Sequence, residues 1–250
     1  GCGHIAKSLI TGLKRDSDYE IIGYDKMQDS LDWLKINNCT PLSLDECCNN
    51  ADILFLCVKP QDMPTLCKEL SAIVNKNQSI VSVAAGIKYE SLKNSLPTDK
   101  IFRAMPNVGT KDNLGITAIF SHSDNSEVLR IFNFLGEAYE VENEDQIDLH
   151  TVLIGSGPAF FYELLSEFER RMDVLVQDKD IKRLISIIFL SSLITSIKNG
   201  ENLDDLIESV ASKGGTTEAG LNFLYKEKFN EIFSGAVDAG VKRAKELSMD

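Results

Sequence analysis

The stretch "GCGHIAKSLITGLKRDSDYEIIGYD" (residues 1–25) decides the fold of this chain. It opens with a G-x-G-x-x-A turn, continues as a helical pattern and ends on a β-like segment with a terminal carboxylate. Gly1 allows the tight turn and Gly3 lets the backbone approach a pyrophosphate, while Ala6 permits close packing of the helix on a strand. Asp25 follows Gly3 by 22 residues, where a carboxylate accepts the ribose 2′-hydroxyl of NAD(H). This spacing predicts a dinucleotide-binding turn. The carboxylate disfavours the 2′-phosphate of NADP(H), although the adjacent lysine softens that preference.

A turn of this kind normally follows a strand, yet no strand precedes Gly1 in the sequence, which also lacks an initiator Met. That first strand would lie at the centre of the sheet. We therefore expect roughly ten further residues upstream of Gly1, in keeping with the usual length of a strand.

Strand and helix patterns alternate through the first half of the chain, which is typical of a mostly parallel α/β sheet. After about residue 143 the strand pattern stops and the remaining sequence is helical in pattern. The boundary falls in "VENEDQ" (141–146), which predicts two domains, 1–143 and 144–250. The expected strands are 19–25, 51–58, 78–85, 100–105 and 115–120, and the expected helices include 28–37, 61–74 and 88–95.

The composition narrows the classes of partner. A formal net charge of −12 argues against a nucleic-acid or anionic-membrane surface, because both depend on clustered Lys and Arg. The six cysteines lie in the first third of the chain without a C-x-x-C pair, and the three histidines have no ligand spacing. We therefore expect reduced thiols, a cytoplasmic location and no metal site. No signal peptide or basic presequence is visible.

The most apolar run is "LISIIFLSSLITSI" (184–197). It is shorter than the roughly 20 residues that span a bilayer, so no membrane segment is expected. Its apolar side chains cover nearly the whole circumference of a helix, which predicts a helix that is buried on all sides. In a small helical domain, such burial indicates a partner subunit.

Three successive strand ends carry unusual residues: "VKP" (58–60), "AAG" (84–86) and "RAMPN" (103–107). Ligands of open α/β sheets bind beyond the carboxyl ends of the strands. The prolines stiffen the chain there, and the small residues leave room for a flat ring. Proline and small residues are common in loops, so any one of these strand ends has an ordinary explanation. Three such ends at one edge favour a cofactor lying across them.

Two glycine-rich stretches interrupt the helical half. "IGSGPAF" (154–160) is compatible with a kinked helix in close contact with its neighbour, or with a functional role. "SVASKGGTTEAGL" (209–221) places two glycines and two threonines between helical patterns. A helix that starts there offers unpaired N–H groups and a positive dipole end, which suit a carboxylate or phosphate.

Taken together, these residues resemble pyrroline-5-carboxylate reductase over essentially the whole chain. The motifs that carry the resemblance, in order, are "GCGHIA", "FLCVKPQDM", "SVAAGI", "RAMPN", "GSGPAFFYELL" and "SKGGTTEAGL". The resemblance implies an enzyme that reduces L-1-pyrroline-5-carboxylate to L-proline with NADPH or NADH, the last step of proline biosynthesis. It also implies an α/β Rossmann-type N-terminal domain and an all-α C-terminal domain through which a homodimer forms, with a ring of such dimers left open.

The resemblance also assigns site residues. "KGGTT" would grip the substrate carboxylate with backbone N–H groups, and the Thr217 hydroxyl would bond the ring nitrogen or the carboxylate. Glu144 would favour a protonated imine, and it joins Thr217 as the catalytic pair. The remaining substrate-binding residues are Ser212, Gly214, Gly215 and Thr216. The cofactor-binding residues are Gly1, Cys2, Gly3, His4, Ile5, Asp25, Val58, Lys59, Pro60, Ala84, Ala85, Asn107 and Ser209.

The chain departs from the family pattern at several positions. Lys213 replaces a proline in the carboxylate loop, Val108-Gly109 replaces Thr-Pro, Glu218 replaces an aliphatic residue and His4 replaces an amide. Two other interpretations stay open: a related dehydrogenase acting on another small carboxylate, and a catalytically silent relative that binds a nucleotide. The first expects a lysine just after the domain boundary, and none occurs between residues 144 and 178.

Overall fold

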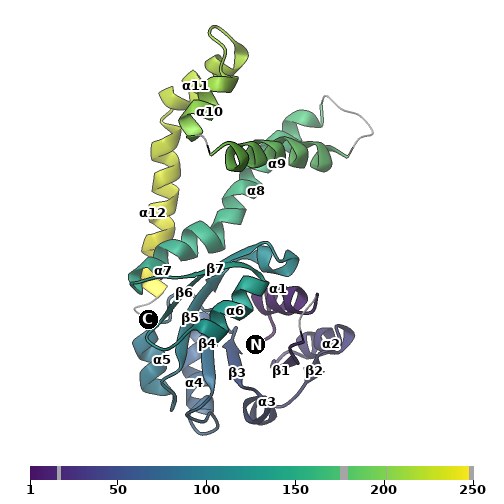
Figure 1. Ribbon diagram of the computed structural model, residues 1–250, viewed down its shortest axis with the longest axis vertical. Coiled ribbons are helices and arrows are strands. Elements are labelled where there is room, and N and C mark those ends of the chain that lie inside the picture. Colours follow the sequence, from purple (N-terminus) through teal and green to yellow (C-terminus); the bar gives the residue numbers. More distant parts are fainter. Residues whose placement is uncertain (16–17, 175–179, 201, 248–250) are drawn as a thin grey trace. The chain divides into compact units, whose positions relative to one another are not determined.

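The computed structural model describes residues 1–15, 18–174, 180–200 and 202–247. The chain divides into two compact units, and Figure 1 labels the elements of both. The sheet unit comprises Gly1–Pro158 with Ala239–Asp250, and the helical unit comprises Ala159–Asp238. The structure thus groups residues 144–158 and the end of the chain with the sheet. The predicted domain division after residue 143 stays a prediction.

The sheet unit contains two sheets, of which the larger has the strand order β3-β4-β5-β6-β7. β3, β4 and β5 run parallel, β6 is antiparallel to β5, and β7 is parallel to β6. The predicted mostly parallel α/β sheet is therefore confirmed. The larger sheet consists of β3 (Ile53–Leu56), β4 (Ser79–Ser82), β5 (Ile101–Pro106), β6 (Gly115–Ser121) and β7 (Gly136–Glu140), and the smaller sheet pairs β1 (Ile22–Gly23) with β2 (Thr40–Pro41).

Helices cover both faces of the larger sheet. Along β5 the side chains alternate, because successive residues of a strand point to opposite faces. Ile101 and Met105 pack with α4, α5 and α7, whereas Phe102 and Ala104 pack with α1 and α6. The helices of this unit are α1 (His4–Leu13), α2 (Gln28–Ile36), α3 (Leu44–Asn50), α4 (Met63–Leu70), α5 (Tyr89–Ser95), α6 (Ser126–Phe134) and α7 (Asp145–His150), with short turns η1 (Pro60–Asp62), η2 (Val108–Asp112) and η3 (Thr151–Ser156).

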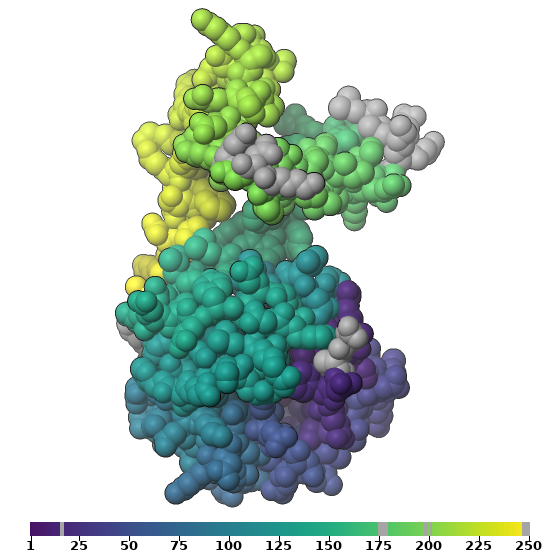
Figure 2. Space-filling view, in the orientation of Figure 1, coloured from purple at the N-terminus to yellow at the C-terminus, as the bar shows by residue number. Residues whose placement is uncertain are grey.

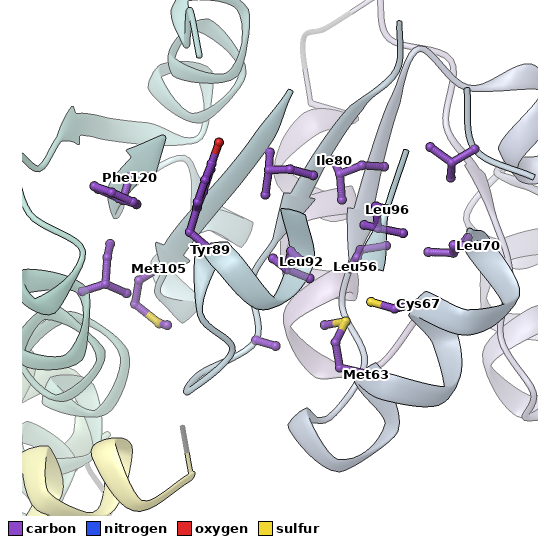
Figure 3. Packing of buried hydrophobic residues seen from close by; sticks show 14 of the residues in the cluster. Leu56, Met63, Cys67, Leu70, Ile80, Tyr89, Leu92, Leu96, Met105 and Phe120 are labelled. Carbon is purple, nitrogen blue, oxygen red and sulfur yellow. The ribbon is translucent and has the colours of Figure 1, made fainter. Parts of the chain in front are cut away.

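The first of these layers forms the larger core cluster. Figure 3 shows Leu56 and Ile80 of the strands among Met63, Leu70 and Leu92 of the helices. All five side chains are buried. Burial of such side chains, at about 1.5–3 kcal/mol each, holds the helices of this layer against β3 to β5.

Some predicted elements differ from the structure in extent. The helix predicted over 61–74 ends at Leu70, and the chain then turns, with Val74 N–H donating to the Leu70 carbonyl. The strand predicted over 19–25 pairs only at Ile22–Gly23. Among the helices and strands of the sheet unit, β2, α3, α6 and β7 were not predicted.

The helical unit contains most of α8 (Gly157–Met172), α9 (Ile181–Asn199), α10 (Leu203–Val210), α11 (Thr216–Lys226) and most of α12 (Phe229–Leu247). Among its described residues, Ile185 alone is buried. The apolar run predicted to be buried on all sides lies in α9, and within this single chain most of it is exposed, as Leu190 and Leu193 show. Exposed apolar surface of this extent marks a protein interface.

The glycine-rich stretch at 154–160 does not break the helix. α7, η3 and α8 follow one another without a gap, and η3 is a π-helical segment. Gly155 lies there, and a Cβ on it would sit 3.7 Å from the sulfur of Met105 at the end of β5. Short π-helical turns inside α-helices are rare and occur frequently at functional sites.

Candidate functional site

The glycine turn lies at the carboxyl end of β3. A Cβ on Gly1 would lie 3.0 Å from Val58 Cγ1 and 3.1 Å from the Cys57 carbonyl oxygen, so only glycine fits there without displacement. Gly3 is the N-cap of α1, and no described atom beyond its own chain neighbours lies within 4 Å of where its Cβ would be. In Figure 2 the N-terminal segment, in purple, reaches the surface of the sheet unit. An open glycine at a helix start is suited to a phosphate group.

Asp25 is joined to this turn by hydrogen bonds. Its Oδ2 accepts from the Cys2 N–H at 2.6 Å, and its Oδ1 accepts from the Met27 N–H at 2.8 Å. The two bonds hold the carboxylate between the glycine turn and the start of α2. Asp25 thus lies against the glycine turn in the structure, and its predicted contact with a ribose hydroxyl stays a prediction.

The predicted strand ends share one edge of the sheet. In the parallel register, Leu56 of β3 lies opposite Ser82 of β4, and Ser82 lies opposite Arg103 of β5. The segments that follow these residues therefore leave the sheet side by side. They contain Val58–Pro60, Ala84–Ala85 and Asn107, which with Gly1–Ile5 we call the strand-end edge.

The loop after β5 is built around Asn107. The Asn107 Oδ1 accepts from the N–H groups of Gly109 and Ile116, at 3.1 and 3.3 Å. Its side-chain oxygen thus shapes the loop, whereas its Nδ2 group has no hydrogen-bond partner in the part of the chain that the structure describes.

This loop also contacts α1 at Gly12, which was not among the predicted site residues. A Cβ on Gly12 would overlap the carbonyl oxygen of Thr110. Arg15, just after α1, pairs with Asp112 at 2.8 Å. The helix that follows the glycine turn is therefore docked directly on the loop after β5. A glycine inside a helix is the signal that indicates such a close approach.

Glu144 lies just before α7 and is held by two groups. Its Oε1 accepts from Arg103 Nη1 and from the Tyr89 N–H, both at 2.6 Å. Arg103 is almost completely buried on β5, whereas Glu144 is partly exposed. Asp148 lies one turn further along α7 and is buried. The Nζ of Lys88, the residue before α5, lies 3.4 Å from its carboxylate. Arg103 begins the "RAMPN" motif but was assigned no role from the sequence, yet it is the buried cation that fixes Glu144.

The helix start in "KGGTT" is present at Thr216, as the sequence predicted. Gly214 has a φ of +74°, a conformation that glycine adopts readily. Two of the loop amides are used internally, since Gly214 N–H donates to Glu218 Oε2 at 2.7 Å and Gly215 N–H donates to the Ser212 carbonyl at 2.9 Å. Within the described residues, the N–H groups of Thr216 and Thr217 have no acceptor. These two amides are therefore among the unpaired N–H groups at the start of α11.

Ser209 and Thr217 differ in how free their hydroxyls are. Ser209 lies on α10, and its Oγ donates to the Leu206 carbonyl at 2.7 Å. Thr217 is half-buried, and its hydroxyl has no partner among the described residues. Both belong to the helical unit, so their predicted placement against the strand-end edge stays a prediction.

The thiols of the sheet unit are protonated at neutral pH. Burial raises the pKa of Cys57, at the end of β3, to about 12, and burial raises the pKa of Cys47 to about 11. A thiolate nucleophile is therefore not available at this edge. No group of three or more possible metal ligands lies together in the part of the chain that the structure describes. Across the same residues, every helix is too short or too polar to cross a membrane.

Two family models match the chain. Residues 144–247 match pyrroline-5-carboxylate reductase dimerisation, and residues 1–86 match NADP oxidoreductase coenzyme F420-dependent. Among curated relatives, pyrroline-5-carboxylate reductase 1 of Bacillus subtilis is 33% identical over 211 residues, which cover 82% of this chain and 71% of the relative.

Solved structures give the same result. The pyrroline-5-carboxylate reductase of Coxiella burnetii is 27% identical, with a TM-score of 0.85 over 99% of this chain and 96% of that one. The Plasmodium falciparum enzyme, solved with NADP bound, is 22% identical, with a TM-score of 0.88 over the same shares of the two chains, and at that identity it supports the fold alone.

Proposed function

This chain belongs to the pyrroline-5-carboxylate reductase family and is an NAD(P)H-dependent oxidoreductase, and we propose that it reduces L-1-pyrroline-5-carboxylate to L-proline, the last step of proline biosynthesis. The observation that carries this proposal is the similarity to the Bacillus subtilis reductase over most of the chain. The dinucleotide, when bound, supplies a hydride to the imine carbon. A protonated imine is already a strong electrophile, so the protein needs no nucleophile.

The residues of the strand-end edge fit a dinucleotide. Open Gly3 leads into α1, so its backbone and the first amides of the helix are free to meet a pyrophosphate. Asp25 accepts a ribose hydroxyl beside them. Ala84 and Ala85 leave room for a ring at the end of β4, and Asn107 offers its Nδ2 group.

The helix-start loop at residues 212–217 binds the substrate carboxylate in this proposal. The N–H groups of Thr216 and Thr217 supply the contacts, and the dipole of α11 adds to the attraction. The Thr217 hydroxyl donates to the ring nitrogen or to the carboxylate. Holding the imine carbon within about 3–3.5 Å of the hydride donor supplies much of the rate through orientation.

Glu144 is part of the same proposal. Its Oε1 is occupied by Arg103 and by the Tyr89 N–H, so Oε2 is the atom that favours the protonated imine. A second role follows from these contacts, because Glu144 also anchors the start of α7 on β5.

The chain forms homo-oligomers through residues that match the dimerisation family. We propose that the unit is a homodimer in which the exposed apolar side chains of α9 are covered by the partner, and a ring of such dimers is the larger assembly to test. The predicted domain boundary at residues 143 and 144 coincides with the start of that family match. A cytoplasmic location is proposed on the six free thiols.

The proposal is tested with the purified protein, pyrroline-5-carboxylate and NADH or NADPH, by the loss of nicotinamide absorbance. Thr217→Ala is expected to lower turnover on the order of tenfold or more, because a hydrogen bond of this kind is worth about 1–3 kcal/mol. Thr65→Ala, which changes an exposed threonine in the first turn of α4, is the matched control and should leave turnover unchanged. Equal turnover in the two variants removes Thr217 from the site.

A further inference from the structure

Asp25 is a fixed carboxylate rather than a mobile surface charge. Each of its oxygens accepts one backbone N–H, from Cys2 at 2.6 Å and from Met27 at 2.8 Å. Both donors belong to the main chain, so side-chain rotation alone does not displace them. Each carboxylate oxygen can accept further hydrogen bonds, and Asp25 is only partly buried, so it can still accept a hydroxyl.

The position of this carboxylate relates it to one part of a dinucleotide. It is tied to the second residue of the glycine turn, whose backbone meets the pyrophosphate. In dinucleotide-binding folds, a carboxylate at the end of the next strand hydrogen-bonds the ribose 2′-hydroxyl. In NADH that hydroxyl is a donor, which a carboxylate satisfies. In NADPH it carries a phosphate, which at neutral pH bears nearly two negative charges and offers a carboxylate almost no proton.

No cation neutralises Asp25 within the described residues, since none forms an ion pair with it. The lysine of α1 and the lysine that follows Asp25 in sequence are engaged elsewhere or exposed. The Lys7 ammonium lies over the Trp33 ring at 5.2 Å from its centroid, and Lys26 is exposed. A phosphate placed beside Asp25 therefore meets an unneutralised like charge.

We infer that this chain selects NADH over NADPH and that Asp25 is the residue that discriminates between them. This inference rests on the proposed function only in that both require a dinucleotide at the strand-end edge. The preference comes from the charge and from the fixed position of the carboxylate together. Removing the charge is therefore expected to admit NADPH, even when an oxygen acceptor remains at the same position.

The test is the dissociation constant of each dinucleotide, measured by titration calorimetry without substrate. In the unchanged protein, NADH should bind at least tenfold more tightly than NADPH. Asp25→Ser should tighten NADPH at least tenfold and weaken NADH. Asp25→Asn keeps an oxygen that can accept the Cys2 N–H, so it separates the loss of charge from loosening of the turn, and it should also tighten NADPH.

Asp29→Ser is the matched control. Asp29 lies in the first turn of α2 and is exposed, so the same charge is removed four residues away without touching the glycine turn. Both dissociation constants should stay within twofold of those of the unchanged protein. Affinities for NADH and NADPH that differ by less than tenfold in the unchanged protein overturn the inference, as does an unaltered NADPH affinity in Asp25→Asn. Tight NADH binding without turnover of pyrroline-5-carboxylate would contradict the proposed function and leave this inference standing.

Discussion

The sheet unit and the helical unit bury their apolar side chains to very different extents. In the sheet unit, Ile80, Leu92 and Phe132 are fully buried. In the helical unit, Leu190 is 57% exposed and Ile232 is 65% exposed. The stability of the first unit is therefore set within one chain, whereas that of the second depends on another surface. Only the second should vary with protein concentration, because association stabilises by mass action.

The largest effect is expected in the core of the sheet unit. Phe132→Ala removes a fully buried ring that packs edge-on against Phe55 at 5.9 Å between centroids. It should lower the free energy of unfolding by about 3–5 kcal/mol in urea denaturation. The loss should be the same at two protein concentrations tenfold apart. Phe223→Ala, at an exposed ring of the helical unit, is the comparison, and its effect should change with concentration. The same concentration dependence for both variants would contradict the contrast between the units.

Breaking the pair between Arg103 and Glu144 is expected to cost nearly as much. Glu144→Ala leaves the buried guanidinium without its carboxylate, which should destabilise the sheet unit by about 3 kcal/mol. Glu144→Gln keeps an acceptor for the Tyr89 N–H and should cost less. The control is Glu127→Ala, which breaks an exposed pair with Arg130 and should cost at most about 1 kcal/mol. Equal losses for Glu144→Ala and Glu127→Ala would show that the first pair has no structural role.

A charge on α9 should separate the subunits. Leu190→Glu places a carboxylate on the exposed apolar face of that helix and is expected to weaken association by about 2 kcal/mol, roughly thirtyfold in the dissociation constant. Sedimentation equilibrium measures this change. Ile36→Glu makes the same substitution at an exposed isoleucine of the sheet unit, and it should leave the mass unchanged. A dimer that is as stable in Leu190→Glu as in Ile36→Glu would exclude this face from the interface.

The reactivity of the thiols measures the folding of the sheet unit alone, because all six cysteines lie in that unit. Burial raises the pKa of Cys47 to about 11, so the folded state favours the neutral thiol. The resulting stabilisation is complete below about pH 9 and is lost as the pH rises toward 11. At pH 8, alkylation of Cys47 by iodoacetamide should be at least tenfold slower in the folded protein than in urea, as mass spectrometry would show. Equal rates in the folded and the unfolded protein would mean that α3, which contains Cys47, does not protect the thiol.

The smallest effect concerns the start of α3. Ser43 and Glu46 form a capping box there, and the Ser43 Oγ accepts from the Glu46 N–H. Ser43→Ala should cost about 1 kcal/mol in the same denaturation experiment. Hydrogen bonds from Ser43 lower the pKa of Glu46 below its ordinary value of 4.5, so the contribution of that carboxylate is present above this pH and is lost on acidification. Ser91→Ala on α5, at a serine outside any cap, is the control. Equal stability of the two variants would show that the Ser43 cap does not contribute to the free energy of unfolding.

Local patterns predicted much of the sheet unit. The strands β3 to β6 were recognised because their runs are mostly apolar and rich in β-branched and aromatic residues, which is typical of buried strands. β7 was missed because its residues, "GEAYE", are mostly polar and partly exposed at the edge of the sheet. α3 was missed because "LDECCNN" is short and has a weak helical pattern.

The site was predictable where it depends on backbone, and less so where it depends on long-range contacts. Glycines at the turn and at the start of α11 carry their own conformational signal, and so they were recognised. The pairing of Arg103 with Glu144 joins residues 41 apart in the chain, and no local pattern indicates it. The internal use of the Gly214 and Gly215 amides follows from loop closure, which only coordinates resolve.

The π-helical turn at Thr151–Ser156 makes the chain unusually sensitive to a change in length. A π-helical turn holds about one residue more than an α-helical turn. Deleting a single residue there would restore the regular repeat and rotate every later side chain of α8 by about 100° about the helix axis. The apolar residues that α8 now presents to one direction, Phe161 among them, would then face another. The presence or absence of one residue at this place therefore sets the direction in which all later side chains of α8 point.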